Sequence, residues 1–426
     1  MKRFWHLSLI PIALCLVAAG TPRAPTPTVE KVAPAVDPKD LPPDDPADIA
    51  LLRAKWRGGL MTDANGNVEN FDCTADDLVG HPELQHAVSR LRHVRFAGAE
   101  GTKGFDLLLA AMASWRNLEN ASFLGPVSDD DLANLENARG LTRISISSDQ
   151  LTDAVFTHIG KLKNLNRISI GPHKKRHAPL KINGNGLKEL SDLRKLTRLA
   201  LVNCPIDDVA LTNLKGLELK WLELRGAAIT DRGIATISDV TTLKELLIVD
   251  TMITDDALSY LPKLRHLSRF TVVGGPRIKG SGLRQIMGMK ELRFLCLEDC
   301  PIDDGAMRYL KGMRLEIIEL GNSRITDRGI EEIKEMTSLE MLGVEHCHIS
   351  DAAMRTIKGL RLKELDVSYT DVSDRGMDEL AGMTSLQDLY VEHTKVTNAV
   401  FAKLNHIKSN SSEPLRIHGI PRRIAP

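Results

Sequence analysis

The stretch VEHCHISD, residues 344–351, places four side chains that can bind metal ions at consecutive positions: Glu345, His346, Cys347 and His348. Carboxylate, imidazole and thiolate groups together form the ligand sets of zinc and copper sites in proteins. A shared metal ion would require all four side chains to point toward one position. Their directions depend on the local secondary structure, and therefore on how the whole chain is organised.

A recurring triplet divides most of the chain into similar units: Ile or Val, then Ser or Thr, then Asp. ITDRGIATI at 229, ITDRGIEEI at 325 and VSDRGMDEL at 372 follow one template. The third residue of the triplet recurs at 208, 231, 255, 280, 304, 327, 351, 374 and 398, so successive gaps are 23–25 residues. Asp153 and Asp129 extend the series backwards, and shorter or less regular copies lie at Gly184 and near Gly104. A period of this length indicates a solenoid of stacked copies.

A second template lies between the triplets, as in LKWLELRGAAI (219–229) and LEIIELGNSRI (315–325). It reads Leu-x-x-Leu-x-Leu-x-x-(Asn/Cys/Thr)-x-Leu with conservative substitutions, which is the leucine-rich-repeat signature. The chain from 104 to 408 therefore resembles the leucine-rich-repeat family, and its ITDxG pattern is similar to the short cysteine-containing subtype. The resemblance implies an α/β solenoid, a curved horseshoe with a parallel sheet on the concave face and helices on the convex face.

Elementary packing explains the template. Alternation about Leu-x-Leu predicts a short strand with one face inward. The Ser/Thr/Asp pair of the triplet can cap a helix whose apolar residues follow at i and i+3, such as Ile234 and Ile237. A single copy cannot bury its apolar edge, whereas stacked copies bury each Leu or Ile with a gain of roughly 1.5–3 kcal/mol.

The chain before the repeats has two expected parts. Residues 1–20 have the charged start, apolar run and small-residue site of a secretory signal peptide, and Cys15 leaves lipidation as an alternative to plain cleavage, beside an uncleaved anchor. Residues 21–46 carry eight prolines and predict a flexible, disordered tether. The sequence therefore predicts export to the periplasm or cell envelope, or secretion.

The ends of the repeat array need covers. Residues 47–103 are expected to form an N-terminal cap, made of a helix, a hairpin and an irregular first repeat. Residues 409–426 are expected to form a C-terminal cap and tail, in which 413–420 is an edge-covering strand. Both caps would shield apolar side chains that have no next copy to pack against.

Composition and motifs limit the function. The 56 Lys and Arg residues balance the 56 Asp and Glu residues, so no global field favours nucleic acid or an anionic membrane. The sequence has no Gly-rich phosphate loop, no GxSxG, no HExxH and no paired CxxC. We therefore expect no enzyme activity, no cofactor, no nucleic-acid partner, no stable membrane insertion after signal cleavage, and a monomer rather than an oligomer.

The template also assigns directions within VEHCHISD. By the resemblance, Cys347 occupies the Asn/Cys/Thr position, which faces inward, and Cys204 and Cys300 share that position in other copies. Glu345 and His346 are expected to leave the strand on the concave side. His348 falls in the following loop, so the four side chains diverge and a shared metal ion is disfavoured. The cysteine pattern thus describes packing, and no disulfide framework is implied.

A weaker metal arrangement comes from the recurrence of VEH at 344–346 and 391–393. Glu345 with His346 and Glu392 with His393 are expected in matching positions two layers apart, with Asp366 between them. Two layers are about 10 Å, which is too wide for one coordination shell unless the side chains lean together. A solvated polar face is the favoured interpretation.

Partner-binding residues are sought among the outward positions of the concave sheet, which the template does not require. In the earlier copies these positions hold Arg143, Arg167, Arg198, Arg225 and Arg269, with Glu223 and Glu245 among them. In the later copies they hold Glu298, Asp299, Glu319, Glu345, Glu364, Asp366, Asp388 and Glu392, with no Lys or Arg. Tyr369 and Tyr390 are expected in outward positions of adjacent acidic copies, and Trp221 further back. Exposed aromatic residues are frequent anchors of protein partners.

These observations favour an exported, non-enzymatic recognition module that binds a protein or peptide along its concave face. Envelope structure or glycan binding is the alternative, in which tether and repeats act as a spacer. A minor alternative is an F-box-type substrate receptor, because the repeats are similar to those of that class. The basic loop 172–178 is expected to be solvated, with an anionic ligand as the other option.

Overall fold

The computed structural model describes residues 45–55, 60–62, 68–73, 93–97, 118–173, 179–404 and 415–419. The predicted signal peptide, nearly all of the tether, the copy near Gly104 and most of the basic loop lie outside these residues.

One sheet of sixteen strands, in sequence order from β1 to β16, runs through the described residues. β1 (Leu60–Thr62) and β2 (Val68–Cys73) pair antiparallel, as expected for the hairpin of the N-terminal cap. From β2 onward each strand pairs in parallel with the next. The remaining strands are β3 (His93–Ala97), β4 (Asn120–Leu124), β5 (Arg143–Ser147), β6 (Arg167–Gly171), β7 (Arg198–Val202), β8 (Trp221–Arg225), β9 (Glu245–Val249), β10 (Arg269–Val273), β11 (Phe294–Glu298), β12 (Ile317–Glu319), β13 (Met341–Gly343), β14 (Glu364–Asp366), β15 (Asp388–Tyr390) and β16 (Arg416–His418).

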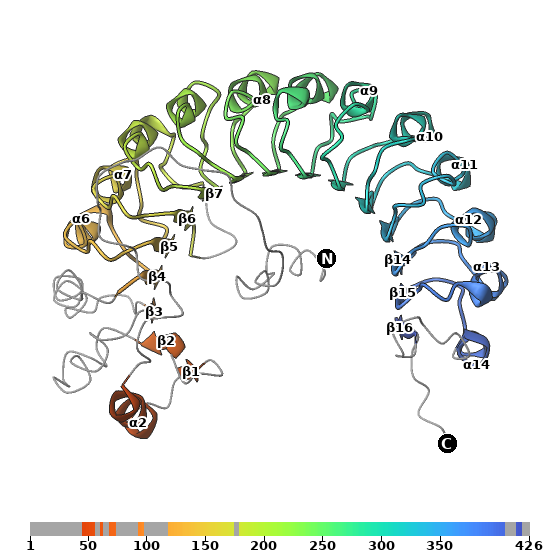
Figure 1. Cartoon of the computed structure of the whole chain (residues 1–426), viewed down its shortest axis with the longest axis horizontal. Coiled ribbons are helices and arrows are strands. Elements are labelled where there is room, and N and C mark those ends of the chain that lie inside the picture. Colours follow the sequence, from red (N-terminus) through yellow and green to blue (C-terminus); the bar gives the residue numbers. More distant parts are fainter. Residues whose placement is uncertain are drawn as a thin grey trace, which may run out of the picture. The chain divides into compact units, whose positions relative to one another are not determined.

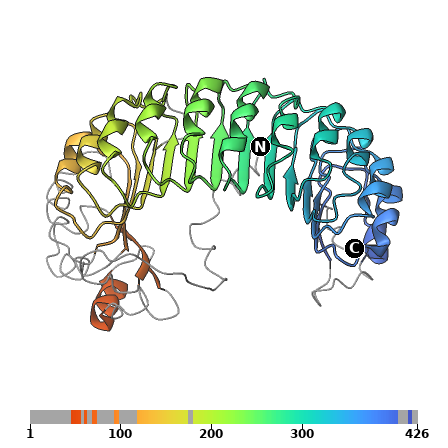
Figure 2. The ribbon, with the colours of Figure 1, turned by 45° about the horizontal axis from the view of Figure 1, so that its top comes forward.

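Short helices connect the strands and form a second layer. Figures 1 and 2 show the strands on the inner, concave side and the helices on the outer side. The helices are α2 (Pro46–Lys55), α6 (Asp129–Ala133), α7 (Val155–Ile159), η1 (Asn185–Leu190), η2 (Ala210–Leu214), α8 (Asp231–Ile237), η3 (Asp255–Lys263), α9 (Leu283–Ile286), α10 (Asp304–Met307), η4 (Arg308–Leu310), α11 (Asp327–Glu331), α12 (Asp351–Ile357), α13 (Asp374–Glu379), η5 (Leu380–Gly382) and α14 (Ala399–Leu404). No helix of the described part is both long and apolar enough to cross a membrane.

The triplet caps these helices as predicted. Thr230, Thr326 and Ser373 each precede a helix with extended backbone, and each hydroxyl accepts a hydrogen bond from the N–H two residues later. This bond satisfies one of the N–H groups that a helix start leaves unpaired.

A single continuous core lies between the sheet and the helices. Leu and Ile side chains dominate it, and Ile234 and Ile237 belong to it as the template predicts. Cys204, Cys300 and Cys347 are also buried there, so the inward direction expected for these cysteines is confirmed. The predicted architecture, a solenoid with a parallel sheet inside and helices outside, is therefore correct.

Candidate partner-binding surface on the concave face

The strand register sorts the outward side chains into rows that run across the sheet. We define the first row as the residue that opens each strand from β5 to β16: Arg143, Arg167, Arg198, Trp221, Glu245, Arg269, Phe294, Ile317, Met341, Glu364, Asp388 and Arg416. The second row lies two residues further along: Ser145, Ser169, Ala200, Glu223, Leu247, Thr271, Cys296, Glu319, Gly343, Asp366, Tyr390 and His418. Neighbours in a row are about 4.8 Å apart.

Only three of the five arginines expected on the concave face lack an ion pair with a described residue. Arg143, Arg167 and Arg198 lie side by side on β5–β7, and none of them forms an ion pair with a residue that the structure describes. Burial, and then the charges of Arg198 and Arg143, lower the pKa of Arg167 to about 10. This trio is therefore the part of the face where positive charge is least compensated.

The other two expected arginines are neutralised by acids of the same face. Arg225 pairs with Glu223 at 3.2 Å and Arg269 with Glu245 at 3.7 Å. Trp221 follows Arg198 in the first row and is only partly exposed. Strands β8–β10 therefore carry charges of both signs on the concave face, and these charges largely cancel.

The acidic end contains a cluster that sequence reasoning missed: Cys296 and Glu298 on β11 and Glu319 on β12. Cys296 and Glu319 are buried, and Glu298 is half-buried. We call these three residues the buried cluster. Their Sγ and carboxylate oxygen atoms lie within 4.8 Å of one another. Cys296 faces Glu319 in the second row, and the spacing i, i+2 in FLCLE was the available signal that Cys296 and Glu298 share a face.

Both carboxyl groups of this cluster have pKa values above those of ordinary glutamates. Burial, reinforced by the charges of Glu319 and Glu345, raises the pKa of Glu298 to about 8. Burial likewise raises the pKa of Glu319 to about 6, against the lowering effect of the Cys296 thiol. Glu319 is 6% exposed, and its Oε2 atom has no hydrogen-bond partner among the described residues.

Two glycines allow Glu345 to approach this cluster. A Cβ atom at Gly321 would lie 2.6 Å from the Glu345 carboxyl group, and one at Gly343 would lie 3.3 Å from its Oε2 atom. Because neither residue has a side chain, the Glu345 carboxylate can lie over both backbones, beside Glu319. Glu345, from the VEHCHISD stretch, thus adds its negative charge to that of the buried cluster.

Asp366 lies on β14, in the layer between the two VEH motifs, but it is not aligned with their glutamates. Asp366 aligns with Gly343 and Tyr390, not with Glu345 and Glu392. The residue between the two glutamates is Ser368, which accepts a hydrogen bond from the His346 N–H at its carbonyl and from the Glu392 N–H at its hydroxyl. Asp366 is 7% exposed and accepts a hydrogen bond from the Ser368 N–H, so it contributes charge but little contact surface.

Three aromatic rings stack along one edge of the concave face. Tyr369 lies between His346 and His393, with ring centroids 4.1 and 4.5 Å apart. The phenol ring therefore separates the two imidazoles, which excludes a metal ion shared by them. Tyr369 is 43% exposed. We call these three residues the aromatic stack.

The backbone of the aromatic stack is left-handed, with φ of 56°, 58° and 53°. Residues at the same position of other copies are also left-handed: Asn203, Asp250, Asp299 and Asn322, with Gly226 and Gly274. Asn, Asp and Gly adopt this conformation at low cost, His is tolerated, and a Tyr is strained by about 1–2 kcal/mol. Strained residues of this kind cluster at functional sites.

Tyr390 belongs to the copy after that of Tyr369 but occupies a different position within it. It lies in the second row and stacks on His418 of β16, with ring centroids 4.3 Å apart. Asp388, expected to be an available acid, accepts hydrogen bonds from Arg416 Nε at 2.8 Å and Nη2 at 2.6 Å. These bonds outweigh burial and, with His418, lower the pKa of Asp388. The last strand therefore neutralises Asp388, whereas Glu364 and Glu392 stay partly exposed.

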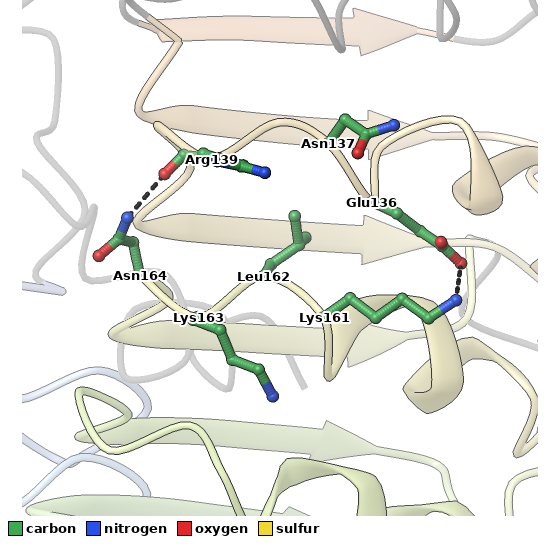
Figure 3. Close-up of a pocket in the computed structure, with 7 residues that line it drawn as sticks. All are labelled: Glu136, Asn137, Arg139, Lys161, Leu162, Lys163 and Asn164. Carbon is green, nitrogen blue, oxygen red and sulfur yellow. Dashed lines mark hydrogen bonds and ion pairs between the residues drawn. The ribbon is translucent and has the colours of Figure 1, made fainter.

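A surface depression on the segments that lead from α6 and α7 to the next strands has no catalytic arrangement (Figure 3). Its lining residues are Glu136, Asn137, Arg139, Lys161, Leu162, Lys163 and Asn164. Lys161 pairs with Glu136 at 2.6 Å, and the Asn164 amide donates to the Arg139 carbonyl at 2.7 Å. These side chains hold neighbouring copies together and include no nucleophile beside a base.

Comparison with known proteins agrees with this architecture. A family model described as leucine-rich repeat matches residues 362–381. The crystal structure of an internalin from Listeria monocytogenes is 19% identical, with a TM-score of 0.51 over 88% of this chain and 96% of that chain. The fold is a leucine-rich-repeat solenoid. The mouse RP105/MD-1 complex contains a second similar chain, 14% identical, with a TM-score of 0.53 over 78% of the present leucine-rich-repeat chain and 61% of that one. No curated protein sequence matches this leucine-rich-repeat chain.

Proposed function

We propose that this leucine-rich-repeat chain is an exported, non-enzymatic recognition module that binds a protein or peptide on the concave face of strands β11–β16. One observation carries the proposal: an exposed aromatic stack on strained backbone lies in the same copies as carboxyl groups with raised pKa. Such strain is retained where it has a use. Export rests on residues 1–20 of the sequence.

The chemistry of the surface favours a basic partner segment. Glu298 and Glu319 are protonated more readily than ordinary carboxyls because they are buried and close to other acids. A Lys or Arg side chain entering the concave face would favour their ionised forms, and charge-assisted hydrogen bonds would replace water. The aromatic stack offers edges and exposed ring atoms for apolar contact at the rim of the same region.

The fold comparisons support a binding role in general terms. RP105 is seen in complex with MD-1, so one chain of this fold binds a protein. A parallel sheet that lines a concave face offers many adjustable side chains on a rigid frame, which suits recognition. The uncompensated arginines of β5–β7 would then meet an acidic part of the same partner, so that charge fixes its orientation.

A glycan-binding spacer is the less favoured candidate. Sugar platforms use the open face of an aromatic ring, but both faces of Tyr369 are covered by imidazoles and Tyr390 stacks on His418. No described residue favours the F-box-type receptor over a general binding module.

The test is affinity capture from exported proteins with the full chain as bait, followed by titration of the purified captured protein. The variant His346→Asn, Tyr369→Asn, His393→Asn removes the aromatic stack and places a residue that this position already accepts at Asn322. We expect at least a tenfold weaker Kd, together with a wild-type melting temperature.

A matched control changes side chains on the outer layer. Glu332→Gln with Glu335→Gln alters two exposed acids that follow α11 and should leave the Kd within twofold of wild type. A partner bound equally well by the triple variant and by wild type would remove the aromatic stack from the binding surface.

A further inference from the structure

The buried cluster on β11 and β12 has the composition of a transition-metal site. Cys296, Glu298 and Glu319 offer one sulfur and two carboxylate ligands, and one ligand atom from each lies within 4.8 Å of the others. Two of the three residues come from one strand and face the same side, and the register of β12 brings the third directly opposite Cys296. Parallel strands with fixed register hold such ligands without a flexible loop.

The cluster is not a completed hydrogen-bond network. Glu319 is more than nine-tenths buried, yet its Oε2 atom has no partner among the described residues. A buried carboxylate oxygen without a partner is costly, and most buried polar atoms in folded proteins are satisfied. Arg269 acts on Glu319 through its positive charge, but its guanidinium group stacks on the Phe294 ring, 4.1 Å from the ring centroid, and pairs with Glu245. The unsatisfied oxygen therefore points to a missing positive group.

We propose that Cys296, Glu298 and Glu319 bind a divalent transition-metal ion of the zinc class. Thiolate with carboxylate ligands suits Zn²⁺, whereas Ca²⁺ and Mg²⁺ need more oxygen ligands and avoid sulfur. Tetrahedral coordination at zinc bond lengths places ligand atoms about 3.5 Å apart, so atoms that lie within 4.8 Å of one another would need to close by little more than about 1 Å at most. The metal site would share Glu298 and Glu319 with the proposed partner-binding surface, but titration with the metal ion alone tests it without any partner.

The surroundings of the cluster favour a cation further. The carboxyl groups of Glu345 and Asp366 act on Glu298 through their negative charge. Gly321 and Gly343 leave the room that lets Glu345 reach this position, where any larger residue would push it away. Glu345 is thus the nearest candidate for an additional ligand or for a hydrogen-bond acceptor of a metal-bound water.

The competing interpretation is a buried thiol that donates to Glu319 and never binds metal. It explains the position of Cys296 but leaves the second oxygen of Glu319 without a partner. The two interpretations differ in whether the cluster takes up an ion at all.

The experiment uses the purified full chain, stripped with a chelator and dialysed. Co²⁺ alone is titrated first, because a Co²⁺–thiolate bond gives a sulfur-to-metal charge-transfer absorption that carboxylates do not produce. Zn²⁺ alone is then titrated by calorimetry. We expect one ion per chain, a charge-transfer band that Zn²⁺ abolishes, and a higher Tm with Zn²⁺.

Variants assign the ligands. Cys296→Ser should lose the charge-transfer band, and Glu319→Gln should weaken Zn²⁺ binding at least tenfold while keeping the size and shape of the side chain. Cys300→Ser is the matched control, since that buried thiol belongs to the inward core; it should bind both ions as wild type does. Circular dichroism checks that each variant is folded. Wild-type chain that binds no Co²⁺ with a thiolate band, or a folded Cys296→Ser chain that keeps the band, would overturn the proposal.

Discussion

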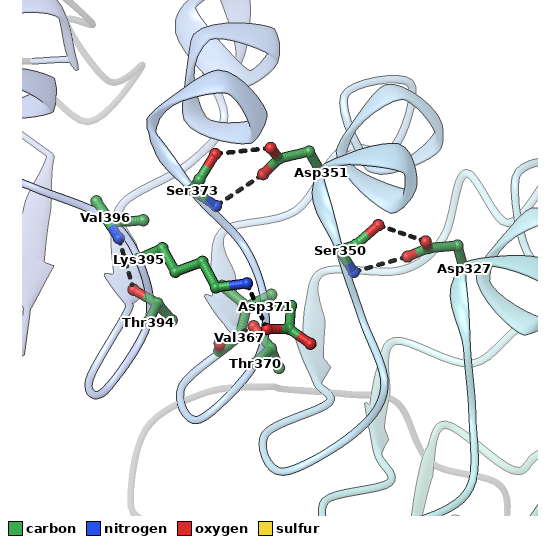
Figure 4. Close-up of polar contacts among 10 residues, drawn as sticks. All are labelled: Asp327, Ser350, Asp351, Val367, Thr370, Asp371, Ser373, Thr394, Lys395 and Val396. Atoms are coloured by element: carbon green, nitrogen blue, oxygen red, sulfur yellow. Dashed lines mark hydrogen bonds and ion pairs between the residues drawn. The ribbon is translucent and has the colours of Figure 1, made fainter.

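The carboxylate of Asp351 accepts two hydrogen bonds from Ser373 of the next copy, from its N–H at 2.7 Å and from its hydroxyl at 2.6 Å. Figure 4 shows this pair and the equivalent pair of Asp327 with Ser350. The same bonds join Asp129 to Thr152, Asp208 to Thr230, Asp231 to Thr254, Asp304 to Thr326 and Asp374 to Thr397. In these copies the Asp of the triplet therefore joins its copy to the Ser or Thr of the following triplet, whereas Asp153 and Asp255 bond backbone N–H groups of the next copy instead.

The glycine of the ITDxG pattern follows from this contact. A Cβ atom at Gly376 would lie 2.6 Å from Asp351 Oδ1, and Gly233 and Gly329 stand equally close to the Asp of the copy before them. Gly376→Ala should therefore displace the Asp351 carboxylate. We expect a loss of about 1–2 kcal/mol in the free energy of unfolding, because charged hydrogen bonds outweigh the helix propensity that alanine gains. Urea denaturation at neutral pH measures it.

Gly382→Ala is the control for this prediction. Nothing lies within 4 Å of a Cβ atom built there, and its φ is not left-handed. The substitution should leave stability unchanged or slightly higher. Equal destabilisation by both alanines would mean that the Asp contact is not the reason for the glycine.

The fold could be predicted from the sequence because its determinants are periodic. Inward Leu and Ile positions, the triplet and the Asn/Cys/Thr position all recur at one interval, and each prescribes a local structure. The sequence assigned the whole Ser/Thr/Asp pair to helix capping. In the structure the second residue of the triplet caps the helix, through the hydroxyl of Ser373 or the carboxylate of Asp303, while Asp351 and its equivalents reach into the next copy. A contact between copies is visible only once they are stacked.

The pH dependence of stability should report the buried acids. The folded pKa of Glu298, about 8, lies above its unfolded value of about 4.3. Between these values the folded state holds a proton that the unfolded state has released, so stability falls as pH rises from about 4.3 to about 8. Glu298→Gln removes this titration and should match wild type near pH 4 but exceed it by about 1–2 kcal/mol near pH 8, since solvent reduces the full shift.

Denaturation curves of wild type and Glu298→Gln at several pH values, with a chelator present, give this difference directly. Subtracting the two curves cancels the titration of every group that does not interact with Glu298. A difference that stays constant from pH 5 to pH 8 would contradict the raised pKa.

The pairing of the last strand, β16, with β15 should depend on Asp388. Its bonds to Arg416 and His418 hold β16 against β15, where the Val391 N–H donates to the His418 carbonyl at 3.0 Å. Asp388→Asn removes the charge of a partly buried pair, worth about 1 kcal/mol, and amide exchange at Val391 should become about fivefold faster.

Asp371→Asn provides the comparison for Asp388. Asp371 pairs with Lys395 at 2.6 Å, but both side chains are mostly exposed, so the pair contributes little to stability. Exchange at Val391 should be unchanged in this variant. If Asp371→Asn accelerates exchange at Val391 as much as Asp388→Asn does, the bonds to β16 are not what protects that amide.

The candidate surface was only partly predictable. The sequence placed acids in the later copies and arginines in the earlier ones, because alternation along a strand assigns faces. It could not show that Asp388 is neutralised, since Arg416 lies in a different copy, nor that Glu345 folds over Gly321. The left-handed backbone at Tyr369 was also hidden, because the aromatic residues replace the Asn or Gly that would have revealed it.

Tyr369→Asn should separate stability from binding. The variant loses two ring contacts, each worth about 0.5–1.5 kcal/mol, but relieves left-handed strain of about 1–2 kcal/mol. These two contributions offset each other. The substitution should therefore change the free energy of unfolding, measured by thermal denaturation, by less than about 1 kcal/mol. Partner affinity, in contrast, should fall several-fold, because the exposed central ring of the aromatic stack is gone. A residue kept only for packing would give the opposite result, with a clear loss of stability and unchanged affinity.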